Sequence, residues 1–169
     1  MDWKLKMEYR LFNNRTGKLE EPITNISFEM LGNFLVFNFE AFNSSLNSFS
    51  NKNNDEIYNG DVVEVFLDLG DDFYYEFEVA PNGTTFIAKI INKLPVFVEN
   101  TFFESNVKVI DNNYFVEMRI DLSKLSQYKE IKFNAFRIET KGIKPNYILQ
   151  ALCPTLTDTF HVREKFIKI

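Results

Sequence analysis

Residues 61–84, DVVEVFLDLGDDFYYEFEVAPNGT, alternate apolar and polar side chains in two runs that a short acidic turn separates. An alternation with a period of two is typical of β-strands that bury one face. The runs at 61–69 and 73–80 both follow this pattern. The side chains expected to face inward are Val63, Val65, Leu67, Phe73, Tyr75, Phe77 and Val79, and those expected to face outward include Glu64, Phe66, Asp68, Tyr74, Glu76 and Glu78.

The second run ends in Pro81-Asn82-Gly83-Thr84, an Asn-Gly signal of the kind that joins two strands of a hairpin. A loop of Asn82 and Gly83 alone predicts three cross-strand pairs: Val79 with Phe86, Phe77 with Ala88, and Glu76 with Lys89. This register is self-consistent, because apolar side chains meet apolar ones and a charge meets its opposite.

The same alternation recurs along the rest of the chain. Further strands are expected at 3–9, 26–30, 34–42, 106–110, 114–121, 131–139 and 147–152. Residues 43–59 form a long loop rich in Asn and Ser, and residues 121–125 suit one helical turn capped by Asp121. We therefore expect an all-β fold: a two-sheet antiparallel β-sandwich with at most one or two short helical turns, forming a single domain over residues 1–169.

Composition excludes several classes of function. A net charge of −5 argues against nucleic-acid binding, and no apolar run is long enough to cross a membrane. One cysteine and one histidine leave no disulfide framework and no cysteine-based zinc site. The first residues lack a secretory pattern, so we expect a cytoplasmic protein unless a signal has been removed, and we expect a monomer.

Residues 57–68, IYNGDVVEVFLD, resemble a segment of family 9 carbohydrate-binding modules and of the wider DOMON-like sandwich group. That segment reads as an aromatic residue, a few polar residues, and then D-x-V-E-x-F-x-D. Four further pieces, at 74–84, 118–120, 133–139 and 151–166, follow in the family's order. The resemblance covers nearly the whole chain and implies a β-sandwich that binds a carbohydrate without catalysing a reaction.

Sugar-binding relatives usually clamp the ligand between aromatic side chains, often tryptophans. This chain has one tryptophan, Trp3, and Leu152 stands where many relatives carry another. A clamp of two tryptophans is therefore impossible, and Tyr58, Phe160 or the loop residue Phe49 would have to take its place.

Glu64 and Glu76 (or Glu78) are expected on the outward face of two paired strands, where like charges destabilise the sheet. We expect Arg137, or else Arg119, to neutralise them. One interpretation is a polar face whose carboxylates and guanidinium bind sugar hydroxyls. The other is a solvated, salt-bridged face without a ligand. A glycosidase pair is disfavoured, because a small sandwich implies no deep cleft.

Two cofactors need consideration. Asp68, Asp71 and Asp72 surround Gly70 in an acidic turn that could offer oxygen ligands to a structural Ca²⁺, although their spacing is not that of an EF-hand. Some DOMON-like domains bind haem through Met and His. The methionines here fall on apolar strand faces typical of core packing, so His161 is expected at the sheet end or the rim of a ligand site.

The sequence thus favours a non-catalytic carbohydrate-binding module. Its binding residues would be Tyr58, Glu64, Glu76, Arg137, Phe160 and His161, roofed by the Asn-rich loop. The alternative is a sandwich that serves as an interaction or scaffold domain and has lost sugar binding, which the scarcity of tryptophan favours.

Overall fold

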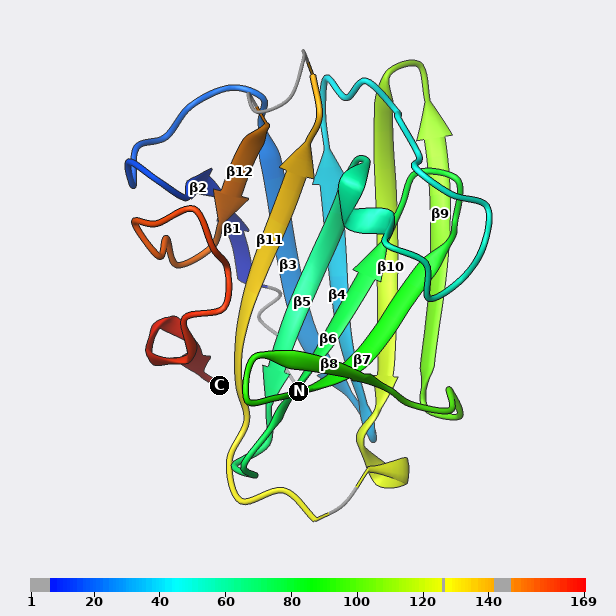
Figure 1. The fold of residues 1–169 in the computed structure, drawn as a ribbon, viewed down its shortest axis with the longest axis vertical. Coiled ribbons are helices and arrows are strands. Elements are labelled where there is room, and N and C mark those ends of the chain that lie inside the picture. Colours follow the sequence, from blue (N-terminus) through cyan, green and yellow to red (C-terminus); the bar gives the residue numbers. More distant parts are fainter. Residues whose placement is uncertain (1–6, 126, 142–146) are drawn as a thin grey trace, which may run out of the picture.

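A computed structural model describes residues 7–125, 127–141 and 147–169. Within these ranges the chain forms thirteen strands and three isolated 3₁₀ turns, one turn more than expected. The strands make two antiparallel sheets packed face to face, which confirms the expected all-β sandwich (Figure 1). No helix in the described part is long and apolar enough to cross a membrane.

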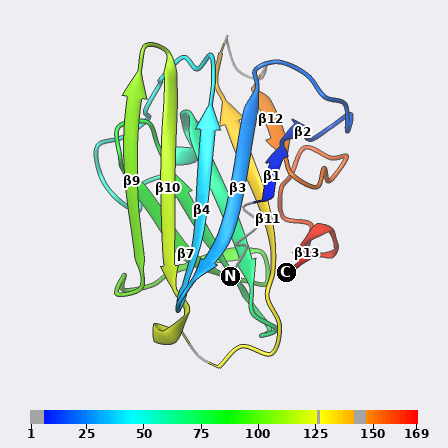
Figure 2. The same cartoon turned by 180° about the vertical axis from the view of Figure 1, so that it is seen from behind.

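The smaller sheet has the strand order β1-β3-β4-β10-β9 and lies nearest the viewer in Figure 2. Its strands are β1 (Met7–Arg10), β3 (Thr24–Leu31), β4 (Phe34–Ala41), β9 (Phe103–Ile110) and β10 (Asn113–Asp121). The segment FLVFNFEAF, apolar on both faces, becomes β4 at the centre of this sheet. The part of the expected first strand that precedes Met7, including Trp3, lies outside the described residues.

The larger sheet has the order β2-β12-β11-β5-β6-β7-β8, and β13 also pairs with β11. Its strands are β2 (Phe12–Asn13), β5 (Val62–Asp68), β6 (Tyr74–Val79), β7 (Thr85–Ile91), β8 (Leu94–Phe97), β11 (Lys132–Glu139), β12 (Ile148–Ala151) and β13 (Ile167–Lys168). The two runs that dominate the sequence pattern are therefore the adjacent strands β5 and β6 at the centre of the sheet.

The main core lies between the two sheets and is rich in aromatic rings. Val63, Val65 and Leu67 of β5 point into it, as the alternation predicts. They meet a group of rings from both sheets that includes Phe28, Phe37, Phe77 and Phe133. Burying a side chain of this size contributes about 1.5–3 kcal/mol, so this layer supplies most of the drive to form the sandwich.

A second apolar cluster covers the outer face of the larger sheet. Phe66 and Phe136 project from β5 and β11, and the C-terminal segment brings Phe160 and Phe166 over them. The 3₁₀ turn η3 (Arg163–Lys165) belongs to the same segment. This face is therefore buried, whereas the sequence pattern alone suggested a polar outer face.

The expected register of the β6–β7 hairpin is wrong by one residue. Val79 pairs with Thr85, and Glu76 pairs with Ala88. The reason is a longer loop: the Ala80 amide donates to the Thr84 carbonyl, and Gly83 adopts a φ of 86° in the left-handed region. The shift by one residue places Phe86 and Ile90 on the outer face.

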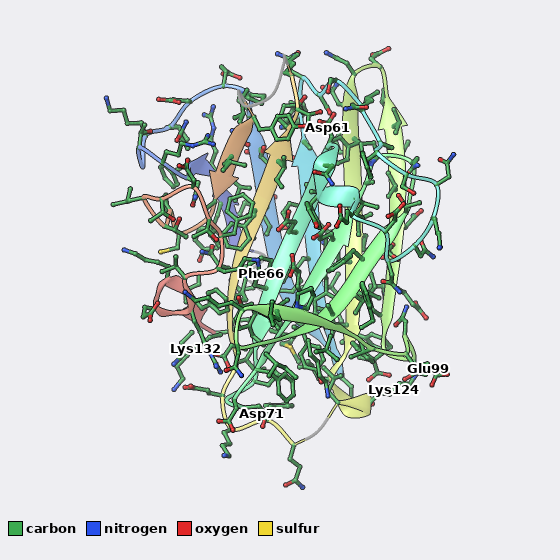
Figure 3. All side chains as sticks on the ribbon, in the orientation of Figure 1. Asp61, Phe66, Asp71, Glu99, Lys124 and Lys132 are labelled. Atoms are coloured by element: carbon green, nitrogen blue, oxygen red, sulfur yellow. The ribbon has the colours of Figure 1, made fainter. Side chains whose placement is uncertain are left out.

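The Asn-rich loop is fastened at the end of the sandwich by buried Asp61, labelled in Figure 3. One Asp61 oxygen accepts hydrogen bonds from Ser44, Ser45 and the Asn47 amide, and the other accepts from the amide and hydroxyl of Thr140. The loop ends in the 3₁₀ turn η1 (Ile57–Asn59). The expected turn capped by Asp121 is also present, as η2 (Leu122–Lys124).

Candidate functional site

A pocket of about 290 Å³ opens on the outer face of the larger sheet. Its floor is formed by outward side chains of β5, β6 and β7, and it includes Phe66, which lies midway along the sheet in Figure 3. Its walls come from Tyr58 at the end of the Asn-rich loop, from the β7–β8 turn, and from residues 158–161. The pocket thus draws on segments that are far apart in the sequence.

Three glutamates lie together on the floor of this pocket. Glu64 of β5 is directly opposite Glu78 of β6, and Glu76 lies next to them on the same face. One oxygen from each carboxyl group lies within 4.8 Å of the others. The side chains are buried, with exposed fractions of 2%, 7% and 0% for Glu64, Glu76 and Glu78. The structure therefore brings Glu64 and Glu76 together and places Glu78, the alternative to Glu76, in the same cluster.

Burial controls the protonation of this cluster. It raises the pKa of Glu64 and Glu78 well above the usual value and raises that of Glu76 to about 7, and repulsion between neighbouring carboxylates adds to the effect at Glu64 and Glu78. Neither oxygen of Glu78 accepts a hydrogen bond from an N–H group or an alcohol hydroxyl of the described residues, and its side-chain hydrogen bond is with the Glu76 carboxyl. No ion pair among those residues involves any of the three glutamates. Within the described structure, the expected salt bridges are therefore absent from the three glutamates, whereas Asp68 at the end of β5 pairs with Arg163.

Aromatic side chains form much of the wall. Phe160 stacks on Phe136 with 4.2 Å between ring centroids and is largely buried. Tyr58 is 38% exposed and makes an edge contact with Phe86, which places it as a partly open ring beside the floor. Both sequence candidates, Tyr58 and Phe160, therefore line the same pocket.

His161 completes this wall and is held in place from two sides. Its ring stacks on Phe66, and Nδ1 lies 2.6 Å from the Tyr74 hydroxyl. Burial lowers the pKa of His161, and the nearby charge of Lys93 lowers it further, so the ring is neutral near pH 7.

The turn between β7 and β8 contributes a rim that sequence reasoning missed. Asn92 and Lys93 have φ angles of 50° and 63°, as the two loop residues of a type I′ turn require. The hairpin bends across the front of the sheet in Figure 1 and carries Lys93 and Pro95 to the pocket. Two polar residues between apolar runs were the signal that could have revealed it.

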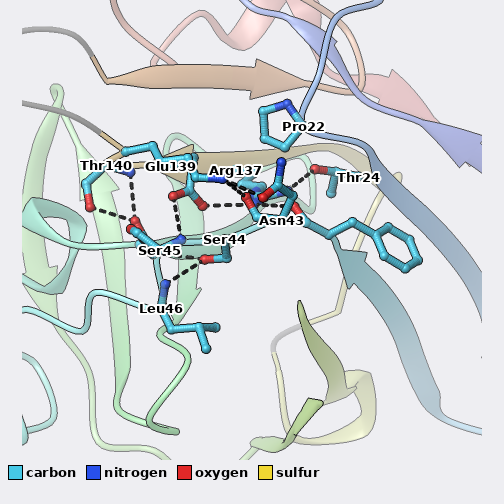
Figure 4. A network of polar contacts seen from close by, with 12 residues as sticks. Pro22, Thr24, Asn43, Ser44, Ser45, Leu46, Arg137, Glu139 and Thr140 are labelled. Carbon is cyan, nitrogen blue, oxygen red and sulfur yellow. Dashed lines mark hydrogen bonds and ion pairs between the residues drawn. The ribbon is translucent and has the colours of Figure 1, made fainter. Parts of the chain in front are cut away.

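Arg137 does not neutralise the glutamates, so that expectation is wrong. Its side chain lies on the inner face of β11, where Phe133 and Ala135 also point, and it is fully buried. The guanidinium pairs with Glu139 at 2.8 Å and donates to the Thr24 hydroxyl and the Phe42 carbonyl (Figure 4). Arg119 is also elsewhere, over the Phe34 ring in the smaller sheet.

The acidic turn after β5 has a cation from the chain itself. Arg163 binds both oxygens of Asp68, at 2.7 and 2.8 Å. Burial alone would raise the pKa of the Asp68 carboxyl, but the Arg163 guanidinium holds that pKa below its usual value. Asp71 lies at the end of the sheet, away from Phe66, in Figure 3. Calcium at Asp68, Asp71 and Asp72 stays a prediction, and the Arg163 contact counts against it.

The Asn-rich loop does not roof the pocket. Of its residues, Tyr58 alone belongs to the described lining, while Phe49 is 52% exposed and lies outside it. The remainder of the loop is fastened to the β6–β7 turn, where Ser50 and Asn51 accept hydrogen bonds from Asn82.

A scan against known protein families matches residues 46–144 to the family described as carbohydrate family 9 binding domain-like. The chain belongs to this family. The match contains the glutamates and Tyr58, whereas Phe160 and His161 lie beyond its end. The C-terminal wall is therefore the part of the pocket that the family 9 match does not cover. A search of curated proteins found no match.

Solved structures share the fold at low sequence identity. A putative carbohydrate-binding protein from Bacteroides uniformis ATCC 8492 superposes with a TM-score of 0.80 at 16% identity, covering 96% of this chain and 85% of its own. A family 9 carbohydrate-binding module from Caldicellulosiruptor kristjanssonii, solved with glucose, gives a TM-score of 0.66 at 17% identity, with 95% and 83% covered. One solved with cellotriose gives 0.62 at 17%, with 86% and 71% covered.

Proposed function

We propose that this family 9 domain binds a carbohydrate in the outer-face pocket and does not catalyse its conversion. The observation that carries the proposal is the combination of a partly open aromatic ring, Tyr58, with three buried carboxyl groups in one pocket. Family membership supports it, and so does the fold shared with modules that were solved with glucose and with cellotriose.

The binding mode follows from the two kinds of side chain. The apolar C–H face of a pyranose packs on the Tyr58 ring, which the Phe86 edge supports from the side. Hydroxyl groups of the sugar then point to the floor and donate to carboxyl oxygens of Glu64 and Glu78. Such bonds supply donors to the Glu78 oxygens, which accept from no N–H group or alcohol hydroxyl of the described residues.

The geometry gives no support to hydrolysis. Glycosidases place two carboxyl groups about 5–5.5 Å or 6.5–9.5 Å apart and keep one of them ionised as nucleophile or base. Here one oxygen of each carboxyl group lies within 4.8 Å of the others, and burial pushes all three groups toward the protonated form. A pocket of this kind suits binding rather than acid–base chemistry.

One feature favours the alternative of an interaction domain. The edge strand β8 exposes Leu94, Val96 and Phe97, with exposed fractions of 68%, 47% and 56%. An unpaired strand edge with apolar side chains is a surface to which another chain can add. The two functions are separable, because this edge and the floor of the pocket use different side chains.

Ligand-observed NMR with glucose-, xylose-, galactose- and mannose-based sugars tests the proposal. A shallow site with one open ring should bind with dissociation constants on the order of 10 μM to millimolar. Tyr58→Ala should weaken binding roughly tenfold. Tyr128→Ala is the matched control, because Tyr128 is 46% exposed and lies outside the pocket lining. No binding by the folded protein across the panel would leave the interaction domain as the better account.

A further inference from the structure

The floor of the pocket holds an excess of acceptors. Glu64, Glu76 and Glu78 contribute six carboxyl oxygens, and completely buried Glu78 accepts from no N–H group or alcohol hydroxyl of the described residues and shares only a carboxyl–carboxyl hydrogen bond with Glu76. A buried acceptor without a fixed donor is destabilising, and more so when it is charged. Glu78 lines the pocket, so a ligand in the pocket is the source of any further donor.

The spacing of these oxygens suits one kind of donor. An ammonium group carries three N–H donors arranged as a tripod. Acceptors about 2.8 Å from a tetrahedral nitrogen lie about 4.6 Å from one another. One oxygen from each of the three glutamates lies within 4.8 Å of the others, so the three carboxyl groups are close enough together to accept from a single nitrogen.

We propose that the preferred ligand is an amine-bearing sugar whose ammonium group binds between Glu64, Glu76 and Glu78. This inference rests on the proposed function and specifies its class of substrate. The sugar ring would occupy the space beside Tyr58 and Phe86, and the ammonium would reach the floor. A positive charge also favours the ionised form of the carboxyl groups. A neutral hydroxyl stabilises that form much less.

The chain does not supply this cation from its own described residues. Lys93 lines the rim but forms no ion pair with the glutamates, and neutral His161 is bonded to Tyr74. Asp158, the other carboxylate of the lining, is engaged by Arg15. The cluster therefore has room for an external charge.

A divalent metal suits the pocket less well. Ca²⁺ takes six to eight oxygen ligands, a number that the three glutamates reach only if all six of their oxygens coordinate. The other floor side chains are apolar, with Phe66, Phe86 and Ile90 among them, and the polar residues Thr159 and His161 belong to the wall. Phenylalanine rings do not ligate calcium, whereas they do attract an ammonium ion through their faces.

The test compares three forms of one sugar by calorimetry at pH 7 in the presence of a chelator. Methyl glycosides of glucosamine, galactosamine and mannosamine are each measured beside the neutral parent and the N-acetyl form. We expect at least one amine to bind tenfold or more tightly than its parent, and its N-acetyl form to lose that advantage. Glu78→Gln keeps the size of the side chain and should reduce the preference to less than about threefold.

The outcomes separate this inference from the proposed function. Neutral sugars that bind as tightly as every amine would overturn the inference and leave the carbohydrate site standing. Failure of all the sugars would overturn both. A third outcome concerns metals, measured without chelator. If Ca²⁺ or Mn²⁺ raises the melting temperature and sugar binding requires the metal, the cluster binds a metal ion instead of an ammonium group. The comparison of amine, neutral and N-acetyl sugars on the wild-type protein tests the inference even if Glu78→Gln does not fold.

Discussion

The two faces of the larger sheet both bury ionisable side chains, but they treat them differently. On the inner face, Arg137 and Glu139 form an ion pair, and Arg137 also donates to Ile23, Thr24 and Phe42. On the outer face, Glu64 and Glu78 face one another without a cation in the described structure. A buried charge that the fold pairs with an opposite charge is structural, even though Arg137 Nε has no hydrogen-bond partner among the described residues. A buried acceptor without a donor, in a pocket, indicates a ligand.

The largest expected effect on stability comes from breaking the ion pair between Arg137 and Glu139. Arg137→Met removes the guanidinium and leaves Glu139 as an unpaired charge at 0% exposure. Breaking such a pair costs about 3–5 kcal/mol of unfolding free energy, or roughly 10 °C in melting temperature. Urea denaturation measures it.

Arg119→Met serves as the control for that experiment. Arg119 is half-buried over a phenylalanine ring, so its replacement should lower the free energy of unfolding by about 0–1 kcal/mol. Equal losses in the two variants would show that the inner-face pair has no special structural role.

The buried glutamates of the outer face should make the stability of the protein depend on pH. The raised pKa values mean that the folded protein holds protons that the unfolded chain releases, so stability is greatest near pH 4.5 and falls as the pH rises through 7. For Glu76, the increase from 4.5 to about 7 corresponds to about 3 kcal/mol.

Glu78→Gln should flatten this dependence and stabilise the protein at pH 8, because an uncharged side chain replaces a buried carboxylate. Denaturation curves at a series of pH values measure both effects. A wild-type protein that becomes more stable between pH 5 and pH 8 contradicts this account of the outer face.

These two faces also show where the sequence was informative. The alternation in β5 and β6 placed Val63 and Glu64 on the correct sides, because each run has one clearly apolar face. It failed for Arg137, because β11 is apolar on both faces, with Phe133 on one and Phe136 on the other, so that the pattern leaves its orientation open.

Two other features depend on contacts that a local pattern does not contain. The hairpin register depended on whether the loop at Gly83 has two residues or three, and both suit an Asn-Gly sequence. The burial of the glutamates depends on the C-terminal segment, which brings Phe160 and His161 over strands that lie far away in the sequence. Periodicity reports which side chains share a face but not what covers that face.

A smaller effect is expected at the acidic turn. Arg163 is 37% exposed, so Arg163→Gln should cost about 1 kcal/mol through the loss of its bond to Asp68. Because this arginine already neutralises Asp68, a chelator should leave the melting temperature of the wild-type protein unchanged. A clear decrease with chelator would instead support structural calcium at this turn.

The most direct test of the central claim is an amide NMR titration with a panel sugar at millimolar concentration. If the unsatisfied outer face is the carbohydrate site, shifts should concentrate in β5, β6 and residues 158–161, while β3 and β4 of the smaller sheet stay unchanged. Shifts confined to the smaller sheet, or no shift with any sugar, would contradict the assignment of the ligand to the unpaired glutamates.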